Sequence, residues 1–486
     1  MADLRRSLVI NFFATSGTKV LQFVVSILLA RILSPSEIGI YSMTIVFVNF
    51  AQVFRDFGVS FYLQREPDLD NEKIRSATGV VFTTSWLIAA ILYGASFWLG
   101  TWFKEPGIVP VMRVLAIGFV FIPFGTVTGA LLARSYAAEK QAIVHVVGTV
   151  CFCASTLILG ELGYGAMAMA YGNLINILAC GIAYIPLRPK GMPWLPGFRH
   201  WKSVAHFGVG SLVTNCASTL NNSIPDIMLG KLGTARHVGL FSRANSTVSI
   251  FSYVVGSTMN YGAVPYMAQT WHRGESLAPI LARSTLLLTG VGWTALALTA
   301  VLGDDIVTAL YGAKWLECVP AILPLVLAAF ITLAFNYTPM AVTAIGRPYL
   351  SAFPVVVTLA TRIGFGVLLF DGSLRGFAWA LLLATIASAP VTVYQQSRYF
   401  GFTAAMMFRT LLPSAVVAAG TGACAWLLTA LLPAELPALA RLLVMVLPLA
   451  SVWYLLLRLT RHELVGEVHR LAAPLKARLA QLRPNV

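Results

Sequence analysis

The chain has 486 residues, of which 58% are hydrophobic and only 11% are charged, whereas about 25% of the residues in a soluble domain are charged. Together with a mean hydropathy of +0.78, this composition excludes a soluble globular protein and predicts an integral membrane protein. The net charge of +15 does not indicate a nucleic-acid partner, because most basic residues lie between apolar segments.

Apolar segments long enough to cross the ~30 Å hydrocarbon core as helices follow one another along the whole chain. Their expected bounds are 8–32, 38–63, 76–103, 108–133, 141–161, 163–186, 203–230, 237–268, 280–302, 319–345, 347–370, 374–397, 408–432 and 437–458. We therefore predict an all-α integral membrane protein with about 14 transmembrane helices. An even number of helices leaves both termini on one side of the membrane.

The distribution of lysine and arginine indicates which side that is. If the chain starts in the cytoplasm, the inner segments and the C-terminal tail hold more than three times as many basic residues as the outer turns. The outer turns would hold Arg31, Lys104, Lys231, Arg236, Lys314 and Arg375. Because basic loops are retained in the cytoplasm, we expect both termini there.

Two twelve-residue segments of the chain have similar sequences. RILSPSEIGIYS begins at Arg31, and KLGTARHVGLFS begins at Lys231, with Gly39 aligned on Gly239 and no gap. Each copy has the pattern of a helical hairpin at a membrane surface, with an apolar segment, a short polar turn and a second apolar segment. Repeats at this distance predict two similar lobes of six helices in the same orientation, with a substrate site at their interface.

From the repeat and the composition we expect five parts. These are an N-lobe with helices one to six (1–186), a proline-rich cytoplasmic linker (187–202), a C-lobe with helices seven to twelve (203–397), helices thirteen and fourteen (398–460), and a basic cytoplasmic tail (461–486). The tail is expected to lie on the inner membrane surface as a helix, or else to be a disordered basic segment.

Ionisable side chains inside apolar segments are costly unless they face a cavity or a partner, so each is a functional candidate. We expect Lys19, Arg55, Arg243 and Arg362 to line a cationic central cavity. Arginine matches phosphate oxygens with two parallel hydrogen bonds, which favours an anionic substrate. Arg113 and Arg243 lie near helix ends, where the alternative is that they reach the membrane surface.

Acidic and neutral polar residues in the segments are weaker candidates. For Asp56 and Asp226 we favour structural contacts. The alternative is that they contact an ion or a sugar. Asn215, Asn222 and Asn245 belong to a polar stripe that suits sugar hydroxyls but also joins helices. We interpret His145 as a packing residue. No metal-ligand spacing or nucleophile motif occurs, so we expect no metal, no cofactor and no catalytic residue.

Several short motifs carry a resemblance to a known family. They are Ala30–Leu33, Gly39–Ser42, Asp56–Gly58, Asp226–Gly230, Gly239–Ser242, and Leu310–Gly312 with Trp315. In this order and spacing they resemble the Wzx-type oligosaccharide flippases. That family belongs to the multidrug/oligosaccharidyl-lipid/polysaccharide exporter superfamily, together with lipid II flippases and MATE exporters. The related lipid II flippases carry cations on helices one, two and eight, where this chain has Lys19, Arg55 and Arg243.

The resemblance implies two six-helix lobes around a central cavity and two further helices. It also implies flipping of an undecaprenyl-pyrophosphate-linked oligosaccharide to the periplasmic leaflet of a bacterial inner membrane, for assembly of a surface polysaccharide such as an exopolysaccharide or O-antigen. The implied partners are the lipid-linked substrate, membrane lipids and a polysaccharide polymerase or export machinery, with no nucleic acid.

Two other functions stay open as alternatives. A MATE-like drug/cation antiporter would be expected to carry a membrane carboxylate on the first helix, where this chain has Lys19. A lipid-linked polymerase or ligase would be expected to carry a large outer loop, but the longest expected connection is the 16-residue linker. We therefore expect a transporter rather than an enzyme.

Overall fold

The computed structural model describes residues 2–470, apart from residues 57–58, 67, 136, 190–191, 194, 200, 252–262, 434 and 468. Inside helices, the side chains at 2–15, 56, 61, 65, 202–215, 217, 251 and 348 also lie outside the description. Every regular element of the described residues is a helix, which confirms the predicted all-α class. The chain divides into two compact units, Met1–Ser242 and Arg243–Val486, which are treated separately below.

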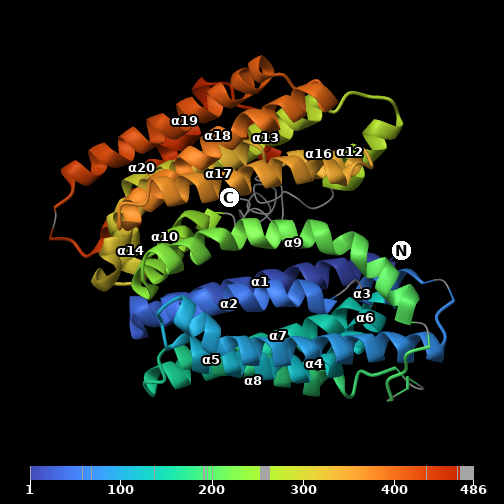
Figure 1. The fold of residues 1–486 in the computed structure, drawn as a ribbon. Coiled ribbons are helices and arrows are strands. Elements are labelled where there is room, and N and C mark those ends of the chain that lie inside the picture. The colour runs from blue at the N-terminus through green and yellow to red at the C-terminus, as the bar shows by residue number, and fades with distance from the viewer. Residues whose placement is uncertain are drawn as a thin grey trace, which may run out of the picture. The chain divides into compact units, whose positions relative to one another are not determined.

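The first unit is a bundle of long helices that run side by side (Figure 1). Its elements are α1 (Ala2–Ile32), α2 (Pro35–Asp56), α3 (Val59–Arg65), α4 (Asn71–Trp102), α5 (Ile108–Phe121), α6 (Pro123–Arg134), α7 (Ala138–Glu161), α8 (Ala166–Tyr184), α9 (Trp201–Leu232) and the start of α10 (Ala235–Phe251). Helix α7 packs between α1 and α8, and α5 packs against α2, α4 and α8. Helices α5 and α6 meet at an angle of 53° at Pro123, which lacks the N–H that would continue the helix.

The second unit is also made of helices. After α10 it contains α12 (Ala263–His272), α13 (Ala278–Val301), α14 (Gly303–Leu310), η2 (Ala313–Ala321), α15 (Ile322–Ala334), α16 (Thr338–Ala344), η3 (Pro348–Ser351), α17 (Ala352–Leu368), α18 (Leu374–Phe400), α19 (Ala404–Leu431) and α20 (Ala438–Leu459). Helix α13 packs against α15 and α19, α18 packs against α15 and α17, and α20 covers α19.

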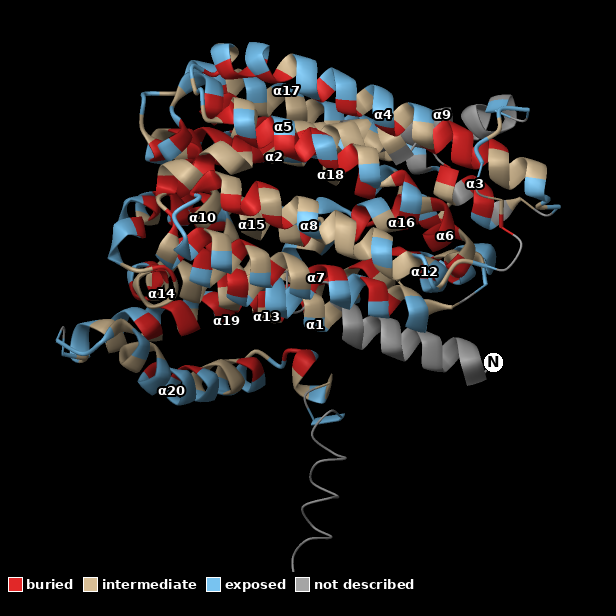
Figure 2. Ribbon diagram, turned by 90° about the horizontal axis from the view of Figure 1, so that it is seen from below, coloured by how far each residue is buried: buried red, intermediate tan, exposed pale blue. Residues whose placement is uncertain are grey.

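The helices have the lengths and surfaces of transmembrane segments. Among the described residues, ten helices are long and apolar enough to cross a membrane, or eleven if α5 and α6 form one bent span. Many large apolar side chains are exposed, among them Leu447 of α20 at 76%. Figure 2 shows long exposed stretches along α20. The chain is thus a multi-pass membrane protein. The total of fourteen helices stays a prediction, because residues 252–262 and the side chains at 2–15 of α1 and 202–215 of α9 lie outside the description.

The segment predicted as a linker lies against α4. The N–H of Gly197 donates to the carbonyl oxygen of Arg75 at 2.9 Å, and Nε of Arg75 donates to the carbonyl oxygen of Leu195 at 3.4 Å. A Cβ atom on Gly79 would lie 2.2 Å from the carbonyl oxygen of Gly197, so this approach requires glycine. The described linker residues are therefore bound to the first unit. The predicted boundaries of the five parts stay predictions.

The two copies of the repeated sequence meet each other within the first unit. A Cβ atom on Gly39 of α2 would lie 1.7 Å from the carbonyl oxygen of Ala235, and one on Gly239 of α10 would lie 1.8 Å from that of Pro35. Pro35 and Ala235 occupy the same position in the two copies, so the contact is reciprocal. It brings the two backbones together at small residues one turn apart, a packing that membrane helices commonly use.

We expect Gly39→Val and Gly239→Val each to destabilise the protein by about 1–3 kcal/mol, because the added side chain must push α2 and α10 apart. The double variant should lose little more than either single variant, since both act on one contact. Thermal unfolding in detergent measures these effects. The control is Gly94→Val in α4, where no other atom lies within 4 Å of an added Cβ. Additive losses in the double variant would show that the glycines act separately.

The chain after α20 is held in the second unit by a buried histidine. His462 is only 3% exposed, and its Nδ1 accepts a hydrogen bond from the N–H of Leu464 at 3.2 Å. Its Nε2 lies 3.1 Å from Oγ of Ser414 in α19, which accepts a further bond from Thr289 of α13 at 2.9 Å. With Nδ1 as acceptor the ring is neutral, and burial lowers the pKa of His462 from its usual value.

This environment predicts a pH dependence of stability. Because the pKa of His462 is lower in the folded than in the unfolded protein, the unfolded protein binds more protons as the pH falls below about 6.5. The contribution of His462 is therefore complete above this pH and is lost on acidification. We expect the melting temperature to fall between pH 7.5 and pH 5, and to fall less in His462→Gln. The exposed His272→Gln should keep the wild-type dependence. An unchanged dependence in His462→Gln would contradict the assignment.

Candidate functional site

A polar cavity of about 570 Å³ lies inside the first unit, within the size range of small-molecule sites. It is formed where α2 and α3 face α5, α6, α7 and α8. The lining residues are Gln52, Arg55, Ser60, Gln64, Phe121, Ile122, Gly125, Thr126, Gly129, Ala130, Ala133, Gln141, His145, Asn176, Ile177, Cys180, Gly181 and Tyr184. All of these residues belong to the first unit, so the geometry of the cavity follows from the packing of that unit.

Arg55 supplies the charge of the cavity. It lies half-buried in the last turn of α2, three residues after Gln52 and therefore on nearly the same face of the helix. Among the described residues that line the cavity, Arg55 is the one permanently charged side chain, and it is accompanied by amides, hydroxyls and the imidazole of His145. A guanidinium in one cavity with amides and hydroxyls suits an anion that also carries hydroxyls.

Two glycines of α6 and an aromatic ring of α8 form one wall of the cavity. A Cβ atom on Gly125 would lie 2.7 Å from Cδ2 of Tyr184, and one on Gly129 would lie 3.0 Å from its hydroxyl oxygen. The ring therefore rests on the bare backbone of α6. Next to it, Nε2 of Gln141 donates to the carbonyl oxygen of Gly129 at 2.8 Å and ties α7 to the same wall.

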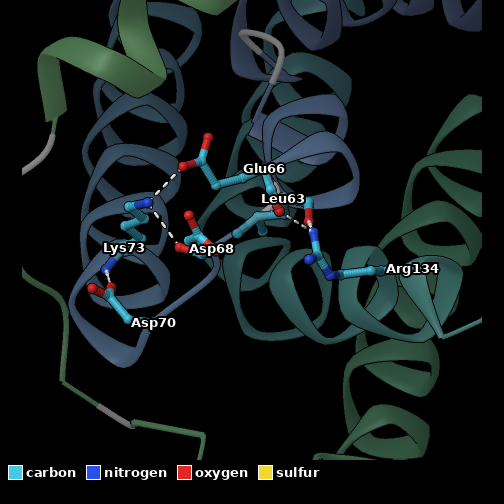
Figure 3. A network of polar contacts seen from close by, with 6 residues as sticks. All are labelled: Leu63, Glu66, Asp68, Asp70, Lys73 and Arg134. Atoms are coloured by element: carbon cyan, nitrogen blue, oxygen red, sulfur yellow. Dashed lines mark hydrogen bonds and ion pairs between the residues drawn. The ribbon is translucent and has the colours of Figure 1, made fainter.

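A polar network holds α3, which brings Ser60 and Gln64 to the cavity (Figure 3). Nη1 of Arg134, in the last turn of α6, donates to the carbonyl oxygens of Leu63 at 3.0 Å and Glu66 at 2.6 Å, which lie at the C-terminal end of α3. The carboxylate of Glu66 pairs with Nζ of Lys73 at 2.5 Å, and Asp70 caps α4 by accepting from the N–H of Lys73 at 2.7 Å. Arg134 thus satisfies carbonyl groups that the helix end leaves open.

The other predicted residues of the first unit lie elsewhere. Lys19 is exposed on α1, Asn222 is exposed on α9, and Asp226 is partly buried on α9. None of the three lines the cavity around Arg55. Arg113 packs instead over the ring of Tyr93 at 5.1 Å from its centre. The side chains of Asp56 and Asn215 lie outside the described residues.

The remaining predicted residues, on α10 and α17, belong to the second unit. The guanidinium of Arg243 on α10 lies 5.7 Å from the centre of the Tyr311 ring, a cation–π contact. Arg362 lies half-buried on α17, and Asn245 is exposed on α10. The common cationic cavity expected for Lys19, Arg55, Arg243 and Arg362 stays a prediction.

Several residues of the cavity were not predicted from the sequence. His145, interpreted as a packing residue, is exposed and lines the cavity, as do Gln141, Asn176 and Tyr184. A helical spacing of four joins Gln141 to His145 and Asn176 through Cys180 to Tyr184, so each set shares one helix face. This spacing is the signal that could have identified them. Within the described residues, no group of three His, Cys, Asp or Glu side chains is placed to hold a metal ion.

Comparison with known proteins identifies relatives along most of the chain. The model of a family described as polysaccharide biosynthesis protein matches residues 28–320. The teichuronic acid biosynthesis protein TuaB of Bacillus subtilis is 22% identical over 85% of this chain and 86% of its own. The succinoglycan biosynthesis transport protein ExoT of Rhizobium meliloti is 21% identical over 79% of this chain and 72% of its own. The solved lipid II flippase MurJ covers 94% of this chain and 100% of its own with a TM-score of 0.75 at 12% identity, a likeness of fold.

We expect Arg134→Ala to destabilise the protein by about 1–3 kcal/mol, because it leaves the carbonyl groups at the end of α3 without a donor. Arg470→Ala removes an exposed ion pair with Glu467 at 3.1 Å and should change stability by less than about 1 kcal/mol. Thermal unfolding of both variants in detergent compares them. Equal effects would mean that Arg134 is no more than a surface charge.

Proposed function

Because the chain belongs to the family of polysaccharide biosynthesis proteins, we propose that it flips an undecaprenyl-pyrophosphate-linked oligosaccharide from the cytoplasmic to the periplasmic leaflet. The glycan would then enter the assembly of a surface polysaccharide of the exopolysaccharide or O-antigen type. The relatives support this proposal, since one bears the name of a biosynthesis transport protein and the fold is that of a lipid II flippase.

The observation that carries the proposal is the cavity around Arg55. A charge inside a membrane bundle costs several kcal/mol and is kept where it binds something. Arginine donates two parallel hydrogen bonds to phosphate oxygens, which matches a pyrophosphate headgroup. The amides of Gln52, Gln141 and Asn176 can bind sugar hydroxyls beside it. Charge and hydroxyls are the two chemical features that a lipid-linked oligosaccharide presents.

The proposed mechanism is alternating access. The lobes open inward and admit the headgroup, and the prenyl tail stays in the lipid between helices. Arg55 binds the pyrophosphate, and Lys19, Arg243 and Arg362 are the further cations proposed to contact the substrate during transport. Rocking of the lobes then exposes the glycan outside. Asn215, Asn222, Asn245, Asp56 and Asp226 would serve as sugar or ion contacts along the way.

The proposed location is the bacterial inner membrane, with both termini in the cytoplasm. The excess of basic residues in the expected inner segments supports this orientation. The partners would be the lipid-linked substrate, membrane lipids and the polymerase or export machinery that receives the glycan. We propose transport without a chemical reaction and without a cofactor.

The described residues that line the cavity favour this function over that of a drug/cation antiporter. A site for organic cations would offer a carboxylate, and the described residues that line the cavity include no Asp or Glu side chain. Transport of a polyprenyl-linked glycan would therefore indicate the flippase, and transport of a lipophilic cation would indicate the antiporter.

The test is the leaflet location of lipid-linked glycan in cells deleted for this gene and complemented with variants. We expect wild type to relieve cytoplasmic accumulation, and Arg55→Ala or Arg55→Glu to reduce transport at least tenfold, since a charge-assisted hydrogen bond contributes about 1.5–3 kcal/mol. The matched control is Arg113→Ala, an arginine of the same bundle outside the cavity. If the deletion strain still delivers glycan to the periplasm, the flippase assignment is wrong. If Arg55→Glu transports normally, the cationic-site assignment is wrong.

A further inference from the structure

A second cavity adjoins the polar one inside the first unit. It measures about 260 Å³ and lies between α5, α6 and α8. Phe121, Ile177, Gly181 and Tyr184 line both cavities. The two spaces are therefore chambers on either side of a common wall, which we call the polar chamber and the apolar chamber.

The apolar chamber has the lining of a site for hydrocarbon. Its other residues include Phe124, Leu178, Ile182 and Ile185, with Thr128. Arg188 also borders the chamber, but its guanidinium donates to the carbonyl oxygens of Met192 at 3.2 Å and of Pro193. This charge is thus engaged by the chain that follows α8, and the chamber presents mainly apolar surface.

The apolar chamber lies beside the lipid-facing surface of the bundle. Phe124, Ile182 and Ile185 are 54%, 65% and 60% exposed, and large apolar side chains exposed on a membrane bundle face the acyl chains. The 53° bend between α5 and α6 adjoins the chamber, since Phe121 precedes it and Phe124 follows it. A chain that enters here from the lipid reaches the common wall within the same unit.

Tyr184 suits a boundary between the two chambers. A tyrosine ring presents an apolar face and a polar hydroxyl, and this ring rests on the backbone at Gly125 and Gly129 of α6. Gly181, one turn before it on α8, has no other atom within 4 Å of the position of an added Cβ. A larger side chain at Gly181 would therefore extend into open space beside this common wall.

From this arrangement we propose that the first unit binds its lipid-linked substrate across the Tyr184 wall. The phosphate lies in the polar chamber at Arg55, and the first isoprene units lie in the apolar chamber between the α5–α6 bend and α8. This inference rests on the proposed function and adds the position of the prenyl chain. It also makes the space between α5, α6 and α8 the route by which the lipid joins its headgroup site.

Gly181→Leu tests the proposal because the leucine enters open space and α-helices accept leucine better than glycine. The matched control is Gly94→Leu in α4, a second helical glycine with no atom near its added Cβ. The probe is radiolabelled undecaprenyl phosphate, with binding measured on the full-length purified protein in nanodiscs. We expect Gly181→Leu to weaken binding at least tenfold and Gly94→Leu to leave it unchanged. Arg55→Gln should also weaken it, through the loss of the phosphate contact.

A photoreactive diazirine analogue of undecaprenyl phosphate adds a positional readout. We expect its crosslinks, mapped by mass spectrometry, to fall on residues 177–185 in wild type and to disappear from them in Gly181→Leu. Wild-type affinity in Gly181→Leu, or crosslinks confined to other helices, would overturn the proposal.

The leaflet assay separates this inference from the proposed function. Normal flipping by Gly181→Leu, combined with unchanged binding, would refute the apolar chamber and keep the flippase. Binding that depends on Gly181 in a protein whose deletion leaves the glycan in the periplasm would keep the chamber and refute the flippase.

Discussion

Hydrocarbon offers no hydrogen-bond partners, and this constraint governs the rest of the structure. Every backbone N–H and C=O inside the bilayer must be satisfied within the protein, so the spanning segments are helices. Hydroxyl side chains follow the same rule by donating to a carbonyl of their own helix, as Thr44 does to Ile40 at 2.7 Å and Thr78 does to Ile74 at 2.8 Å. Polar groups left over from this pairing gather at a few places, and these places are the candidates for function.

The polar chamber is one such place. Its amides and hydroxyls come from membrane helices, and Arg55 adds a permanent positive charge to them. In the proposed function, an anionic headgroup would contact this charge during its passage. A site of this kind binds its substrate without holding it permanently, which is what a flippase requires.

Glycine determines how closely the helices approach. At Gly39 and Gly239 the absence of a side chain lets α2 and α10 meet backbone to backbone, and at Gly125 and Gly129 it makes room for the ring of Tyr184. At Gly181 it leaves open space beside the common wall of the two chambers. Glycines that look equivalent in the sequence thus allow a close contact between the repeats, the packing of a ring and a free volume beside a cavity wall.

The sequence by itself determined the class of the protein. Apolar length and the scarcity of charge are local properties, and they sufficed to predict helices, a membrane location and the two-copy hairpin, whose glycines the structure brings into contact. The same local reasoning singled out Arg55, because an arginine inside an apolar segment is costly wherever the helix packs. Local properties of the sequence could not predict that His145, Asn176 and Tyr184 line the same cavity, because this depends on which faces of α7 and α8 turn toward α2. Only the tertiary structure decided that Arg55 has these neighbours and that Arg113 packs on Tyr93, since helix rotation and contact between distant segments are set by side-chain packing across the bundle.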